Sequence, residues 1–186
     1  MIDKVIKSIA DDMNRFLKTK HDITEDKVVP SHVMNADGTV AMQEVDKVVM
    51  TLVNIEPERI QSNNTKYVRN QKGNYVKEKP SVNVNLVIMF SAYFSNENYL
   101  EGLKFISSII AYFQSNSGVL TSQNIPSLSE NADRLIAELI SLDSTNLGNV
   151  WSLLGGKYMP SALYRFKAVS IRHDLPTMPT PMIRKA

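Results

Sequence analysis

The chain has 186 residues, of which 43% are hydrophobic and 22% charged, as expected for one globular domain with a core of its own. The 21 basic and 19 acidic residues leave a net charge of only +2, which does not indicate a nucleic-acid or membrane-surface partner. Because the chain contains no cysteine, disulfides, thiolate nucleophiles and thiolate metal sites are excluded.

The N-terminus passes directly into an amphipathic pattern, with no apolar signal segment or cleavage site. The longest apolar runs, 87–94 and 106–113, are well short of the ~20 residues that cross a bilayer. We therefore expect synthesis in the cytoplasm and no membrane insertion.

Hydrophobic periodicity predicts the first elements. Apolar residues at three- and four-residue spacing predict a helix over 2–20 that docks on a sheet, with Asp11 and Asp12 on its solvated face. Strands are expected over 27–34 and over the β-branched run 47–55.

The segment 61–80 is polar, and a turn at 72–74 predicts a long exposed hairpin or loop within 61–79 that faces a partner or the lumen of a ring. Basic and aromatic residues alternate in this hairpin, a pattern that can stack bases and follow phosphates. A nucleic-acid-binding module at 66–79 is therefore the alternative function, against a hairpin kept polar for solubility. Its candidate interface residues are Lys66, Tyr67, Arg69, Lys72 and Tyr75.

The middle of the chain carries the clearest strand, 82–90, which becomes apolar on both sides and should be central in its sheet. A helix is expected over 98–115, with Leu100 among its apolar residues. Glu56 and Glu58 flank Pro57 and precede Arg59, so a local ion pair is expected there rather than acid–base catalysis.

The last part predicts a short strand at 119–121, a strand at 133–142 for which a helix is the competing assignment, and a helix over 145–154. Asp143 and Ser144 offer an N-cap for that helix, and Gly155-Gly156 offers its end. A final strand is expected over 162–173. Residues 174–186 contain three prolines and should be extended. The fold class is α+β: a single domain with a mixed or antiparallel sheet flanked by helices.

Catalytic patterns are missing from the sequence. Its three histidines, His21, His32 and His173, have no metal-ligand spacing. Gly155-Gly156-Lys157 is not a phosphate-binding loop, because a tyrosine follows the lysine and the glycines end a helix. We predict a non-enzymatic protein with no catalytic residue, no cofactor and no metal.

Six segments of the sequence carry a joint pattern: the opening helix and residues 49–59, 80–86, 99–103, 109–114 and 149–164. The block around Trp151, Gly155-Gly156 and Pro160 is the most specific of them. Together these segments resemble the cap, or tail-terminator, family of extracellular contractile injection systems of the antifeeding-prophage and Photorhabdus virulence-cassette type.

The resemblance implies a tail-terminator-like fold and a homohexameric ring at the baseplate-distal end of a phage tail-like particle. The implied partners are the sheath protein and the inner-tube protein of that particle, and nucleic acid is not favoured. Residues 1–173 would form the terminator domain and 174–186 an extended tail. Some related chains carry a further C-terminal domain, which this chain would lack.

Two further groups are candidate interface residues. Large apolar side chains near the Gly-Gly bend suit an interface, although for Trp151 a place in the domain's own core is the favoured interpretation. Apolar residues of the tail are expected to dock on a neighbouring subunit or on sheath, unless the tail folds back on its own domain. The two groups are Trp151, Leu154, Lys157, Tyr158 and Met159, and Leu175, Met178, Met182 and Ile183.

Overall fold

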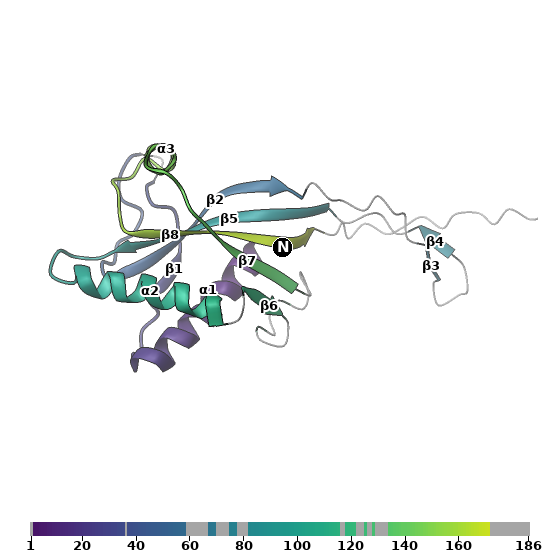
Figure 1. The fold of residues 1–186 in the computed structure, drawn as a ribbon, viewed down its shortest axis with the longest axis horizontal. Helices are drawn as coiled ribbons and strands as arrows, with labels where there is room; N and C mark the ends of the chain where they lie inside the picture. The colour runs from purple at the N-terminus through teal and green to yellow at the C-terminus, as the bar shows by residue number, and fades with distance from the viewer. Residues whose placement is uncertain are drawn as a thin grey trace, which may run out of the picture.

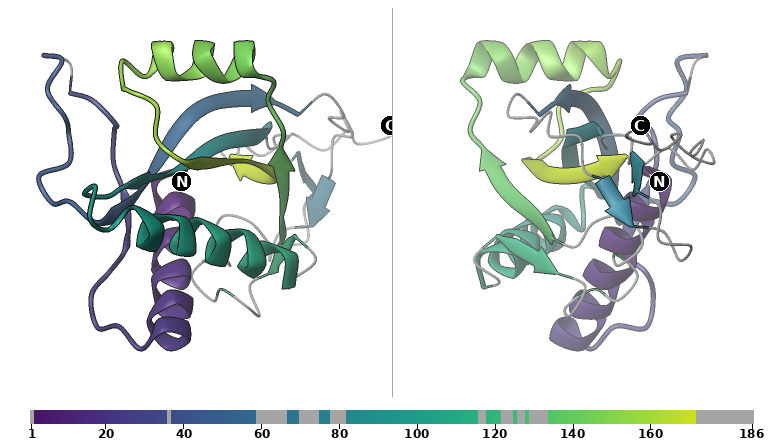
Figure 2. Two further views of the ribbon diagram at one scale, coloured as in Figure 1. Left: turned by 60° about the vertical axis from the view of Figure 1, so that its left-hand side comes forward. Right: turned by 90° about the vertical axis from the view of Figure 1, so that its right-hand side faces the viewer.

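The computed structural model has three layers, with a curled sheet between two helices on one side and one helix on the other (Figures 1 and 2). It describes residues 2–35, 37–58, 67–69, 75–77, 82–115, 118–121, 125, 128 and 134–171. Among these residues no helix has the length and apolarity that a bilayer crossing requires.

The helices and strands alternate irregularly along the chain, as in an α+β domain. The helices are α1 (Ile2–His21), α2 (Tyr99–Ser115) and α3 (Ser144–Leu153). The strands are β1 (Val28–Pro30), β2 (Lys47–Pro57), β3 (Tyr67–Arg69), β4 (Tyr75–Lys77), β5 (Val82–Tyr93), β6 (Val119–Thr121), β7 (Arg134–Ile140) and β8 (Ser161–Ile171).

Six strands form the main sheet in the order β1-β2-β5-β8-β7-β6. Only β1 and β2 pair in parallel, and the other neighbours are antiparallel. The long strand β5 lies at the centre, because β2 pairs along one of its edges and β8 along the other. Strands β3 and β4 form a separate antiparallel pair, so the predicted hairpin is present.

The larger core lies between the sheet and the pair α1 and α2. Helix α1 contributes a stripe at i, i+4 and i+8 through Val5, Ile9 and Met13, all fully buried. Phe113 of α2 packs 4.5 Å from the ring of Tyr164 on β8 and 5.9 Å from that of Phe90 on β5, between ring centroids. These rings join α2 to the two central strands.

A smaller core covers the opposite face, beneath α3 (Figure 2, left). Trp151 of α3 is buried there against Val87, Met89 and Leu163, with Val33 beside them. Because β5 is buried on both faces from Leu86 to Phe90, its prediction as a strand covered on both sides is confirmed. Trp151 belongs to the core of its own domain, as the favoured interpretation stated.

The helix predicted over 2–20 is confirmed, and so are the strands at 47–55 and 119–121. Residues 133–142 form a strand rather than the competing helix. Helix α3 is capped by the Asp143 carboxylate, which accepts a hydrogen bond from the backbone N–H of Asn146 at 2.8 Å. The expected strand 27–34 is wrong beyond Pro30, because the chain leaves the sheet there and runs toward α3.

Asp12 corrects the expectation of a solvated helix face. Its side chain is almost fully buried, and it accepts hydrogen bonds from the hydroxyl of Tyr112 on α2 and from the guanidinium of Arg15. Both donors reach the carboxylate, so its charge is compensated where it leaves water. Asp12 therefore joins α1 to α2, a role that depends on a residue 100 positions away.

One further expectation differs from the structure. Leu100 is 77% exposed, because at 100° per residue it lies about 140° around α2 from the buried Phe105. Glu56 pairs with Arg165 of β8, whose Nε lies 3.0 Å from the carboxylate. Arg59 lies outside the described residues, so the local ion pair expected with it stays a prediction.

Gly118, between α2 and β6, provides a test of this fold. It has φ +68, and an added Cβ would lie 2.6 Å from the carbonyl oxygen of Ala137 on β7. A Cβ added to Gly38, which has φ +80, would meet no atom within 4 Å. Substitution of Gly38 therefore measures the backbone strain without any steric overlap. We expect Gly38→Ala to lower the free energy of unfolding by about 1–2 kcal/mol, and Gly118→Ala to lose about 1–3 kcal/mol more through steric overlap. Urea denaturation measures both variants, and equal losses would contradict this packing.

Candidate functional site

An apolar groove lies at the end of the sheet where β5 ends and β8 begins. Its volume is about 550 Å³, and its walls come from the loop after β1, the end of β5, the start of α2 and the bend after α3. The residues that line it are Val33, Met34, Val40, Met42, Val49, Ala92, Tyr93, Phe94, Asn96, Tyr99, Gly155, Gly156, Lys157, Tyr158, Met159 and Pro160.

The bend that forms one wall depends on its two glycines. Gly155 has φ +67, which ends α3 as the sequence predicts. A Cβ on Gly156 would lie 2.8 Å from a methyl group of Val33 and 3.5 Å from the Trp151 ring. The bend therefore packs against the smaller core more closely than any side chain would allow.

The rim of the groove exposes large side chains to solvent. Tyr158 is 66% exposed and Tyr99 51% exposed, although both carry sizeable apolar rings. Two methionines from the loop after β1, Met34 and Met42, face the cavity together with Met159 from the bend. Flexible thioethers and aromatic rings are typical of surfaces that accept an apolar partner.

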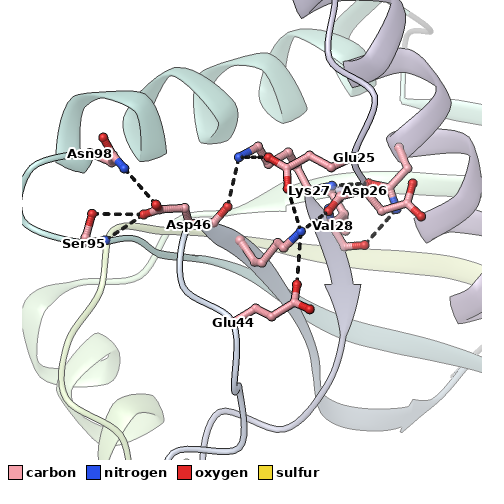
Figure 3. Close-up of polar contacts among 10 residues, drawn as sticks. Glu25, Asp26, Lys27, Val28, Glu44, Asp46, Ser95 and Asn98 are labelled. Atoms are coloured by element: carbon pink, nitrogen blue, oxygen red, sulfur yellow. Dashed lines mark hydrogen bonds and ion pairs between the residues drawn. The ribbon is translucent and has the colours of Figure 1, made fainter.

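The opposite wall is held by the carboxylate of Asp46, which precedes β2 (Figure 3). It accepts hydrogen bonds from the backbone N–H of Ser95 at 2.9 Å, from the Ser95 hydroxyl at 3.2 Å and from the Asn98 side chain at 2.8 Å. Asp46 itself has φ +65, a conformation that aspartate adopts more readily than most residues. These contacts fix the loop before β2 to the segment that connects β5 to α2.

Two buried lysines extend this network toward β1. Lys27 donates to the backbone carbonyl of Asp46 at 3.3 Å and pairs with Glu25 at 2.6 Å. Lys47 pairs with Glu25 at 3.1 Å and with Glu44 at 3.3 Å. Each ammonium thus has an anionic partner where it is shielded from water.

The pKa values follow from these contacts. Hydrogen bonds from Lys27 and Lys47 lower the pKa of Glu25. The Ser95 backbone N–H and the Asn98 amide lower the pKa of Asp46. Burial by itself would lower the pKa of Lys47, but its bonds to the two glutamates outweigh burial and raise it. All these groups are therefore charged at neutral pH.

A second polar feature crosses the sheet on the side of α3. Arg165 of β8 bonds Glu56 of β2 and Glu138 of β7, and Lys167 reaches Glu138 at 2.9 Å. Hydrogen bonds first from Lys167 and then from Arg165 lower the pKa of Glu138. Since these side chains are partly exposed, the ladder orders the surface more than it stabilises the fold.

The structure brings together only part of the candidate interface residues. Lys157, Tyr158 and Met159 line the groove, whereas Leu154 packs on the smaller core that contains Trp151. Tyr67, Arg69 and Tyr75 belong to the β3–β4 pair, with Arg69 opposite Tyr75. The remaining candidates, Lys66, Lys72, Leu175, Met178, Met182 and Ile183, lie outside the described residues.

Sequence reasoning missed the other groove residues, Met34, Val40 and Met42 among them, and it missed the role of Asp46 behind the groove wall. The sequence Asn-Ala-Asp-Gly at 35–38 is typical of a turn, but it does not indicate which surface the loop completes. Within the part of the chain that the structure describes, no group of three or more histidine or carboxylate side chains is arranged to hold a metal ion.

The family model of the Pvc16 N-terminal domain matches residues 4–185. The chain belongs to this family. The match covers nearly the whole chain. The resemblance drawn from the sequence is confirmed.

Two solved structures share the fold. The cryo-EM structure of the anti-feeding prophage cap, a tube-terminating cap, matches 96% of this Pvc16 N-terminal domain chain with a TM-score of 0.60 and 14% identity. The sheath/tube terminator of PVC, an extracellular contractile injection system, in its extended state matches 100% with a TM-score of 0.63 and 16% identity. The chain spans 58% and 63% of the lengths of those two chains. No curated protein gives a significant match.

The Asp46 clamp predicts a pH response of the groove wall. Because contacts in the fold lower the pKa of Asp46, its stabilising effect is complete above the ordinary aspartate pKa of about 4 and is lost as the pH falls through the lowered value. The Ser95 amide signal in NMR spectra should shift with that midpoint.

The variant Asp46→Asn should abolish the Ser95 titration and increase amide hydrogen exchange in the loop several-fold at neutral pH. The matched control is Asp37→Asn, since the Asp37 carboxylate accepts hydrogen bonds from Thr39 within its own turn. Equal effects of the two substitutions would show that Asp46 does not hold the wall.

Proposed function

We propose that the chain is a non-enzymatic structural subunit that closes the baseplate-distal end of a contractile injection particle. The observation that carries this proposal is the agreement of the fold, over 96% and 100% of the chain, with two terminator structures. The family match over residues 4–185 supports it independently.

The subunit acts as a homohexameric ring that contacts the last ring of the inner tube and the last ring of the sheath. A cap works by occupying the final interface of a polymer, so it needs large complementary surfaces and no catalytic group. The groove supports such a role, because a monomer would leave Tyr99, Tyr158 and Val40 exposed. Closure into a ring also covers surfaces that would otherwise be free to aggregate.

Synthesis and assembly take place in the cytoplasm, and the subunit leaves the cell only as part of a phage tail-like particle. The β3–β4 hairpin faces a partner in this arrangement. Residues 174–186 extend from the terminator domain formed by 1–173.

Deletion of the gene tests the terminator role. Without a cap, tube and sheath polymers lack the contacts that stop growth, so we expect particles of variable length or with unstable ends. Electron microscopy measures the length distribution, and expression of the unchanged chain from a plasmid provides the control. Labelled protein should lie at one end of each complemented particle. Normal lengths and normal contraction in the deletion strain would refute the proposal.

A further inference from the structure

The groove and the end of the last strand lie at opposite ends of the domain. Pro160 lines the groove and directly precedes β8, whereas Ile171 ends β8 opposite Val82, the first residue of β5. The groove instead adjoins the other end of β5, at Ala92 and Phe94. The end of β8 at Ile171 therefore lies one full strand length from the groove.

Residues 172–186 have a composition that matches the groove. Leu175, Met178, Met182 and Ile183 are apolar, and three prolines separate them. Proline favours an extended backbone and removes an N–H that an apolar groove could not satisfy. The segment thus loses little conformational entropy on docking.

Chain length decides between the groove of the same subunit and that of a neighbour. Strand β8 has 11 residues, so its two ends are about 33 Å apart at ~3.3 Å per residue. A return to the same subunit's groove would use about ten extended residues, leaving Leu175 and Met178 along the path. A neighbour whose groove faces the end of β8 can receive all four apolar residues.

We propose that residues 174–183 of each subunit dock in the groove of the adjacent copy of this chain. The proposal rests on the ring arrangement put forward above and identifies the contact that joins its subunits. Each copy gives an arm at one end and receives one at the other, so the exchange is head-to-tail and closes only in a ring.

The absence of cysteine from the chain makes crosslinking a direct test. Two full-length versions, one with Met178→Cys and one with Tyr158→Cys, are produced together in cells that assemble the particle. Different tags distinguish the two chains by mass. Tyr158 is a suitable position because its side chain is exposed at the rim. The matched control replaces Tyr158→Cys with Leu139→Cys, a 49% exposed apolar residue on β7 that does not line the groove.

Docking raises the local concentration of the arm at the groove, so a short bis-maleimide should link the Met178→Cys and Tyr158→Cys chains at least about tenfold more than the Leu139→Cys pair. Adding Met159→Glu to the Tyr158→Cys chain should reduce this yield to the control level. A third version carries Met178→Cys and Tyr158→Cys in the same copy. If crosslinks form only within that single chain and not between copies, the proposal is wrong.

Particle length and subunit position separate the two proposals. If the variants cap particles of normal length but the groove pair links no better than the control, the arm exchange is wrong and the terminator role stands. If the subunit is not at the particle end, the terminator role fails. The same crosslink measured on the purified chain in solution then decides whether copies exchange arms.

Discussion

A strand that is apolar on both sides requires cover on both faces of its sheet, and β5 imposes this requirement on the whole domain. Its residues from Leu86 to Phe90 are buried without exception. Helices α1 and α2 cover one face with a large aromatic core, while α3, with only ten residues, covers the other. Helix α3 is too short to cover the end of β5. The loop after β1 and the bend after α3 cover that end instead. The groove forms where these two segments meet.

The groove therefore depends on features that do not belong to the core. One wall needs a bend so close to Val33 that only glycine fits at position 156. The other needs a loop without regular structure, which Asp46 fixes by accepting three hydrogen bonds from Ser95 and Asn98, just before α2. An apolar cavity between two segments held in this way keeps its shape before a partner arrives, which lowers the ordering cost of binding.

Periodicity was enough to predict α1, β5, α3 and β8, because each has a continuous apolar pattern and clear end signals such as Asp143 and Gly155. It failed where a partner distant in the sequence decides the outcome. Asp12 follows another acidic residue and looks solvated, yet Tyr112 of α2 makes its burial possible. The groove itself was not predicted. Of its lining residues only Lys157, Tyr158 and Met159 were named from the sequence, as candidate interface residues, because the residues of the facing loop carry no pattern that indicates their neighbours. The exposure of Leu100 could have been predicted, since the angular position of a residue around a helix follows from the sequence alone.

A closed ring of identical subunits joined head to tail needs two unlike surfaces on each copy. The antiparallel pairing of β5 and β8 supplies this difference, because it places the start of one strand beside the end of the other. At one end it gathers two loops and a helix start around an apolar cavity, and at the other lies the last residue of β8, Ile171, beside Val82. A surface that matched itself would produce a dimer and stop. The polarity of two neighbouring strands thus accounts, in physical terms, for the two unlike ends of the domain, which the ring proposed above requires.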